Sequence, residues 1–254
     1  MYSKINDFCK VRNEGNCSLN KETPTERVIF IIDLLTSESI PYELDTFYSE
    51  RMKCNMFNIY LKGSSDKFVV AHHDIVNPLT DNANDNSASV INAIMIKKIK
   101  PEINVALLDG EEYGGQGSQR LSELILNNKF GKISWVLNLE LTGSGGENFF
   151  IGYYPGKLTN HIRSIFDCPI LHTPFNDSVI FNKNGIDSVV INPAHILKKA
   201  EDSDYNNPRT LIYKGNVLST ELLWNCHTSK DTLATISTQD MKDFVEKVVL
   251  PILI

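Results

Sequence analysis

Histidines and acids follow several apolar stretches of this sequence. The stretch VVAHHD continues from an apolar segment into His72 and Asp74. In the same way, NVALLDGEE ends in Glu111 and Glu112, and WVLNLE ends in Glu140. Imidazole nitrogens and carboxylate oxygens are donors that zinc binds, at roughly 2.0–2.2 Å. If the apolar stretches are neighbouring strands of one sheet, the side chains at their ends form a metal site.

Two further segments carry the same donor types. Asp85 stands in NANDNSAS, a loop built almost wholly of small polar residues, and His227 follows the apolar run 222–224. Taken alone, Asp85 is typical of a turn and His227 of a helix cap. His73 is expected to face away from the site, because side chains alternate along an extended segment and His72 lies on the other face.

Acids that crowd together need compensating positive charge. Carboxylates without a cation repel one another and raise each other's pKa, and a pair of dications removes that penalty. Two ions can share one bridging carboxylate. Glu111 and Glu112 are adjacent and leave their strand in different directions. One of them can therefore bind a metal while its neighbour faces the substrate as a general base.

The pattern of apolar residues predicts strands that alternate with helices. Runs typical of strands are found at residues 55–61, 67–71, 104–108, 134–141, 149–154 and 188–192. Helical periodicity follows residue 25 and recurs at 87–98, 118–127 and 238–249. The strands do not alternate cleanly, which is typical of parallel strands that helices cover on both faces. We therefore expect an α/β three-layer sandwich with a mostly parallel central sheet and ligands beyond the carboxyl ends of its strands.

Composition indicates one soluble domain. The chain has 254 residues, 42% of them hydrophobic, which is enough for one large core. We expect a single domain over residues 1–254, with residues 1–23 as an N-terminal arm or short helix. The net charge is −6 and the lysines are scattered, so no nucleic-acid partner is expected.

The cysteines and the apolar runs indicate the compartment. Five cysteines show no tight spacing, which favours reduced thiols and a cytoplasmic protein. No signal peptide is recognised, and the longest apolar runs are too short to cross a bilayer, so no membrane partner is expected. The sequence does not predict an oligomeric state.

Taken in order, five segments resemble the motifs of a known enzyme family. AHHD, NANDNSAS, LLDGEEYGGQGS, NLELTG and CHTSKDT are similar to those of metallopeptidase family 28, the co-catalytic zinc aminopeptidases of the leucyl-aminopeptidase type. The resemblance extends from about residue 25 to the C-terminus. It implies the zinc-exopeptidase fold (phosphorylase/hydrolase-like), two zinc ions as cofactors, and a peptide with a free N-terminus as substrate.

The resemblance also implies a role for each residue. The metal ligands would be His72, Asp85, Glu112, Glu140 and His227. Asp85 would bridge the two ions, and Asp74 would orient the imidazole of His72. Glu111 would act as the general base, taking a proton from a metal-held water so that the resulting hydroxide attacks the peptide carbonyl.

Some positions depart from the family pattern and leave other functions open. Glu140 stands where the commonest pattern has Asp, and Cys226 where some relatives have an aromatic residue. One rival is a glutaminyl-cyclase-like acyltransferase with a single zinc, and another is an inactive peptidase-fold binding domain. A third alternative is an enzyme that hydrolyses an amide other than a peptide. We also expect Asp177 and Phe181 to border the substrate pocket.

Overall fold

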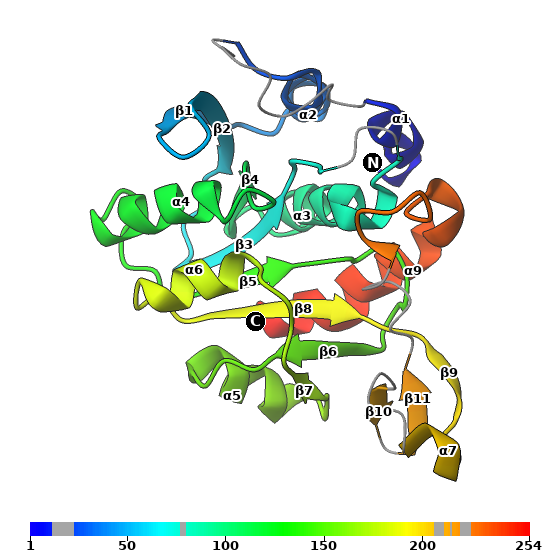
Figure 1. Cartoon of the computed structure of the whole chain (residues 1–254). Coiled ribbons are helices and arrows are strands. Elements are labelled where there is room, and N and C mark those ends of the chain that lie inside the picture. The colour runs from blue at the N-terminus through cyan, green and yellow to red at the C-terminus, as the bar shows by residue number, and fades with distance from the viewer. Residues whose placement is uncertain (12–22, 77–79, 206–210, 214, 219–224) are drawn as a thin grey trace.

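The computed structural model describes every residue except 12–22, 77–79, 206–210, 214 and 219–224 (Figure 1). Its strands are β1 (Glu43–Ser49), β2 (Cys54–Leu61), β3 (Lys67–His72), β4 (Asn104–Leu108), β5 (Trp135–Leu139), β6 (Phe149–Gly152), β7 (Ile170–Leu171), β8 (Ser188–Pro193), β9 (Ile196–Lys199), β10 (Leu211–Tyr213) and β11 (Asn216–Leu218). Within the described residues, eight strands form one sheet in the order β1-β2-β4-β3-β5-β8-β6-β7. The last three strands form a small separate sheet.

Helices lie on both faces of the large sheet. The helices of the described residues are η1 (Tyr2–Lys4), α1 (Ile5–Lys10), α2 (Glu26–Ser37), η2 (Ala83–Ser87), α3 (Ala88–Ile99), α4 (Gln116–Leu126), α5 (Lys157–Ile165), α6 (Asp177–Lys183), α7 (Asp202–Tyr205), η3 (Leu233–Thr235), α9 (Thr238–Phe244), η4 (Val245–Val249) and α10 (Leu250–Ile252). Helices α4 and α6 cover one face, and α2, α3 and α9 cover the other (Figure 1). The predicted three-layer sandwich is confirmed.

The centre of the sheet is parallel. Strand β3 pairs with both β4 and β5, and β5 pairs with β8, all in parallel. Strands β2 and β6 join this centre antiparallel, through β4 and β8 respectively. Because the central strands share one direction, the residues that follow them lie at the same edge of the sheet, where α/β proteins bind their ligands.

Strand β3 shows why its apolar residues do not alternate with polar ones. Val69 and Ala71 pack into the core on the α3 side, whereas Phe68 and Val70 pack into the core on the α4 side. Burial of each large apolar side chain stabilises the fold by about 1.5–3 kcal/mol. Every interior position of the strand is therefore apolar, and polar chemistry begins only where the strand ends, at His72.

Arg27 links the N-terminal helices to this edge of the sheet. It lies in the first turn of α2 and is fully buried. Its Nε donates a hydrogen bond to the carbonyl oxygen of His73 at 2.5 Å, and its Nη2 donates to Ser87 Oγ at 2.6 Å. Its guanidinium carbon lies 3.9 Å from the centroid of the Phe8 ring in α1, a cation–π contact. One side chain therefore contacts α1, the end of β3 and the loop that carries Asp85.

The structure differs from the predicted elements in some places. Strand β1 was not predicted, because ELDTFYS is a partly exposed edge strand with polar residues on it. The strand predicted for 134–141 ends at Leu139, so Glu140 is the first residue beyond it. The apolar run 222–224 and residues 12–22 of the predicted N-terminal arm lie outside the described residues.

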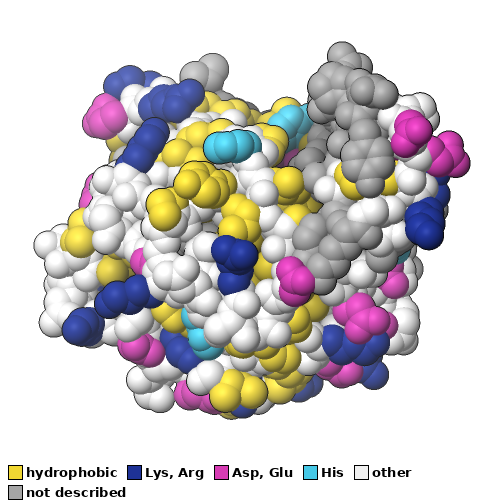
Figure 2. All heavy atoms as spheres, turned by 90° about the horizontal axis from the view of Figure 1, so that it is seen from below, with side chains coloured by type: hydrophobic (Ala, Val, Ile, Leu, Met, Phe, Trp, Pro, Cys, Tyr) yellow, Lys and Arg dark blue, Asp and Glu magenta, His cyan; other side chains and the backbone are white. Residues whose placement is uncertain are grey.

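The surface carries charges of both signs. Figure 2 shows the face seen from below in Figure 1, where Lys and Arg side chains are interspersed with acidic and uncharged ones. Hydrophobic side chains run across the middle of this face. Among the described helices, none combines the length and the apolar character that crossing a bilayer requires.

Candidate metal centre

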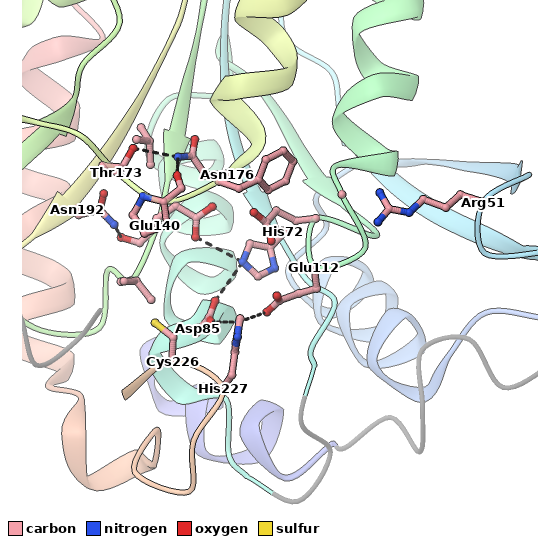
Figure 3. Close-up of a pocket in the computed structure, with 16 residues that line it drawn as sticks. Arg51, His72, Asp85, Glu112, Glu140, Thr173, Asn176, Asn192, Cys226 and His227 are labelled. Carbon is pink, nitrogen blue, oxygen red and sulfur yellow. Dashed lines mark hydrogen bonds and ion pairs between the residues drawn. The ribbon is translucent and has the colours of Figure 1, made fainter. Parts of the chain in front are cut away.

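A pocket opens at the carboxyl ends of β3, β4, β5 and β8 (Figure 3). Its volume is about 620 Å³, which is within the range of small-molecule sites. The predicted ligands and the predicted base all line it: His72, Asp85, Glu111, Glu112, Glu140 and His227. Segments far apart in the chain therefore converge on one cavity.

His72, the last residue of β3, forms one corner of the pocket. Its Nε2 lies 3.2 Å from Asp85 Oδ1 and 3.4 Å from Glu140 Oε2. The carboxylate of Glu140 also accepts a hydrogen bond from Asn138 Nδ2 at 3.2 Å. Both His72 and Glu140 are buried, so their positions are set by the packing of β3 and β5.

Asp85 faces a second corner with its other oxygen. Its Oδ2 lies 3.2 Å from Nε2 of His227, which is also 2.9 Å from Glu112 Oε1 (Figure 3). His227 is about half exposed, whereas Asp85 and Glu112 are largely shielded from solvent. The carboxylate of Asp85 thus lies between the two histidines, as the resemblance implies for a bridging ligand.

Of the three donor groups among the described residues, two share Asp85, and the third consists of His72, Glu111 and Glu112. His72, Asp85 and Glu140 form the first, and the second combines Asp85 with Glu112 and His227; within each group the donor atoms lie within 4.8 Å of one another. Two atoms that bind one zinc ion at about 2.1 Å in tetrahedral geometry are roughly 3.4 Å apart. The nitrogen–oxygen distances of 2.9–3.4 Å match that spacing. The residues present therefore fit a pair of cations.

Asp74 lies behind His72 and not in the pocket. Its Oδ1 is 3.4 Å from Nδ1 of His72, on the side of the ring opposite Asp85. The same carboxylate accepts hydrogen bonds from the backbone amides of Glu111 and Glu112, at 3.2 and 3.1 Å. One buried acid thus orients the imidazole and also holds the turn that carries both glutamates.

Asp231 holds the Asp85 loop in a similar way. Its carboxylate accepts hydrogen bonds from the amides of Asn84 and Asp85, at 2.8 and 3.0 Å. Burial raises the pKa of this carboxyl group to about 6. The peptide bond between Asp85 and Asn86 is cis. Asp231 therefore positions the shared carboxylate without lining the pocket.

Burial makes the three glutamates of the pocket difficult to ionise in the absence of a cation, whereas at Asp85 hydrogen bonds with His227 and His72 outweigh burial and lower the pKa. Burial raises the pKa of Glu111 well above its usual range, and nearby Glu140 and Asp177 raise it further. Burial also raises the pKa of Glu112 to about 7 and raises that of Glu140. A bound cation would offset this cost, because it favours the ionised carboxylates.

The histidines respond to the same acids in the opposite sense. Hydrogen bonds with Asp85 and Glu112 raise the pKa of His227 to about 10. Burial opposes a charge on His72, but Glu140, Asp74 and Asp85 together raise its pKa well above the ordinary value. Each histidine must lose a proton before its nitrogen can bind a metal, so metal binding would release protons.

Two expectations about neighbouring residues have different outcomes. His73 faces away from the pocket as predicted: its Nε2 pairs with the carbonyl oxygen of Phe57 at 2.8 Å, and burial lowers its pKa to about 4. The expectation that Asp177 and Phe181 border the pocket is wrong. Both are fully buried in α6, and Phe175, which precedes this helix, lines the cavity instead.

Asp177 gives a pH-dependent prediction. Burial raises its pKa to about 7, so the native state retains a proton that the unfolded state loses near pH 4. The contribution of Asp177 to the free energy of unfolding therefore falls as the pH rises from about 4 to 7. Asp177→Asn is expected to flatten this dependence, measured by urea unfolding of metal-free protein across that range.

The matched control for this prediction is Asp33→Asn, which removes an exposed carboxyl group from the surface of α2. This control is expected to retain the pH dependence of the parent protein. An equal slope in the parent and in Asp177→Asn would contradict the protonation of the buried acid.

Arg51 also lines the pocket, and the sequence did not indicate it. Arg51 lies in the polar turn between β1 and β2, with no motif around it, and β1 itself was not predicted. Its position depends on how the hairpin packs against the rest of the protein. A local sequence pattern carries no signal of that packing.

Comparison with solved structures finds the same fold in several enzymes. The LapA aminopeptidase of Legionella pneumophila aligns with a TM-score of 0.71 at 13% identity, covering 99% of this chain and 68% of LapA. BSAP, a zinc aminopeptidase from Bacillus subtilis, aligns at 0.60 and 18% identity, covering 79% of this chain and 50% of BSAP. A glutaminyl cyclase from Porphyromonas gingivalis aligns at 0.68 and 17% identity, covering 99% of this chain and 95% of the cyclase.

None of the curated proteins compared with the sequence matches it. The sequence does match the family model of peptidase family M28 over residues 60–250, which is most of the chain and includes every residue of the pocket described above except Arg51. The protein therefore belongs to peptidase family M28, and it is a metallopeptidase.

Proposed function

We propose that the protein is an aminopeptidase that removes N-terminal residues from peptides, with two zinc ions and Glu111 as the general base. In this proposal, residues 1–254 act as one catalytic domain. The observation that supports it most is the pair of donor groups that share Asp85. A single-metal site needs only one such group, whereas His72 and Glu140 supply donors for a second ion.

The proposed mechanism assigns separate tasks to the ions and to the protein. When bound, zinc would polarise the scissile carbonyl and make a nearby water more acidic. A carboxylate oxygen of Glu111 accepts a proton from that water and then donates it to the nitrogen of the leaving amine. Glu111 is next to both donor groups, since its carboxylate lies within 4.8 Å of donor atoms of His72 and Glu112.

The acids of the pocket also suit the free N-terminus of a substrate. A protonated α-amino group is a cation, and the pocket presents it with several carboxylates, among them Glu112 and Glu140. A substrate with an acetylated N-terminus lacks this charge. Selectivity for a free α-amino group would limit cleavage to the first residue.

A glutaminyl cyclase is the second candidate function. It is favoured by one observation: the alignment with the Porphyromonas gingivalis glutaminyl cyclase covers 95% of that chain, against 68% of LapA. That chemistry also begins at a free N-terminus, because the α-amino group of a glutaminyl residue attacks its own side-chain amide and releases ammonia. The two candidates differ in their products.

The test combines metal content with three substrates. We expect elemental analysis to give about two zinc ions per chain, as in enzymes with paired metals. We expect hydrolysis of leucyl-p-nitroanilide and no hydrolysis of its N-acetyl derivative. Ammonia released from a glutaminyl dipeptide, with one zinc and no anilide hydrolysis, would instead establish the cyclase. Cleavage of the acetylated substrate at an equal rate would exclude an aminopeptidase.

A further inference from the structure

Arg51 is a cation in a pocket otherwise lined by acids, histidines and uncharged residues. Among the described residues that line the pocket, it is the one Lys or Arg side chain (Figure 3). A positive charge at this place repels the α-amino group of a peptide and attracts an anion. We propose that Arg51 binds a carboxylate on the leaving part of the substrate and so selects peptides that carry one there.

The hairpin turn that carries Arg51 is fixed to the metal-site side of the protein. Ser49 Oγ donates a hydrogen bond to Gln116 Oε1 at 2.9 Å and accepts one from the Met52 amide at 3.1 Å. The Lys53 amide donates to the carbonyl oxygen of Ser49 at 2.7 Å. The turn is thereby tied to the first residue of α4, directly after the segment that carries Glu111 and Glu112.

Gly114 leaves space for the guanidinium group. A Cβ atom at this position would lie 2.1 Å from Arg51 Nη1, and the backbone φ of +91° disfavours any residue with a side chain. The arginine therefore lies against the backbone of the same turn that presents the glutamates to the pocket. Its guanidinium is close to the site without displacing any of the donor residues.

The guanidinium of Arg51 has no ion-pair partner within the described part of the chain, unlike other basic residues nearby. Lys53 in the same turn pairs with Glu50 at 2.8 Å, and Arg120 makes two hydrogen bonds to Asp45. A guanidinium fork that is not already engaged matches the two oxygens of a carboxylate. The Arg51 guanidinium is therefore suited to bind a carboxylate group of the substrate.

The position of Arg51 relative to the candidate metal ligands indicates which part of the substrate it would contact. In Figure 3, Arg51 lies on one side of the metal-binding candidates, whereas Thr173 and Asn192 lie on the other. The inference rests on the proposed function, in which the cationic N-terminus binds among the acids. Charge repulsion keeps that end away from Arg51, so the part of the peptide beyond the scissile bond extends towards it.

A carboxylate beyond the scissile bond has two sources. It is either the C-terminal carboxylate of a dipeptide or the acidic side chain of the second residue. Leucyl probes suit the test, because the residues that line the pocket include the apolar Leu141, Pro174, Phe175 and Val190. The first pair of probes is leucyl-alanine and leucyl-alaninamide. The second pair is leucyl-glutamyl amide and leucyl-glutaminyl amide.

The experiment compares kcat/KM within each pair for the parent protein, Arg51→Gln and Lys53→Gln. For one of the pairs, we expect the kcat/KM of the charged substrate divided by that of the neutral substrate to fall about tenfold in Arg51→Gln. This is the size expected of a partly solvated charge-assisted contact. The affected pair identifies the source of the carboxylate. Lys53→Gln removes the same charge two residues away and is expected to keep the parent ratios. Unchanged ratios for both pairs in Arg51→Gln would overturn the proposal.

A binding measurement separates this inference from the proposed function. Calorimetry on Glu111→Gln protein, with and without Arg51→Gln, gives dissociation constants for the same four probes without turnover. If no probe is cleaved by the parent but binding of the charged probes still depends on Arg51, the proposed hydrolysis is wrong and the carboxylate site stands. If the probes are cleaved and the ratios of their kcat/KM values are the same with and without Arg51, the proposed aminopeptidase activity is supported and the proposed carboxylate site is wrong.

Discussion

Glu111→Gln is expected to lower kcat by about a thousandfold, within the range that general-base catalysis contributes. The amide has nearly the same shape as the carboxylate but cannot accept a proton at the working pH. Burial raises the pKa of Glu111, and a carboxylate with a raised pKa is a stronger proton acceptor. Steady-state hydrolysis of leucyl-p-nitroanilide measures this loss.

The neighbouring residue provides the control. Glu112→Gln makes the same chemical change one position along, but it removes a carboxylate that lies 2.9 Å from His227. It is expected to lower the zinc content measured by elemental analysis, whereas Glu111→Gln is expected to keep the parent content. Parent turnover in Glu111→Gln, or an equal loss of zinc in both variants, would show that the two glutamates do not divide the tasks of base and ligand.

Asp85→Asn is expected to reduce zinc at both positions and to abolish turnover. The carboxylate of Asp85 directs a different oxygen to each histidine, at 3.2 Å from both His72 and His227. An amide has a single oxygen and no negative charge, so it cannot bridge two cations. Elemental analysis after dialysis measures the zinc that each chain retains.

The comparison variant is His227→Ala, which removes a donor from one group only. It is expected to lose about one zinc ion per chain, because the other group keeps its three donors. If Asp85→Asn and His227→Ala retained the same amount of zinc, a shared carboxylate would be excluded. Circular dichroism shows whether either variant still folds.

The fold and most of the donors could be predicted because their signals are local. An apolar run followed by an acid or histidine marks the end of a buried strand, and parallel strands must end at one edge. His72, Glu112 and Glu140 are brought together by that geometry alone. Asp85 lies in η2 and His227 in a turn, both away from the strand ends, and only their resemblance to family motifs indicated their place.

Residues whose positions depend on tertiary packing were not predictable in this way. Arg51 reaches the pocket through an edge hairpin tied to Gln116. Arg27 resembles any basic residue in the first turn of a helix, yet it is fully buried beneath the site. Asp177 was expected at the surface of the pocket, but α6 carries it inside. For both arginines the residues that they contact are distant in the chain, and no spacing rule encodes such contacts.

The contacts of Arg27 have a thermodynamic consequence for the N-terminal helix α1. This side chain contacts the His73 carbonyl, Ser87 and the Phe8 ring at once, so it couples the first helix to the segments that carry His72 and Asp85. Any ligand that binds better when these segments are in place must, by linkage, also favour the docked N-terminal helix. Detachment of that helix would in turn weaken the binding of such a ligand by the same free energy.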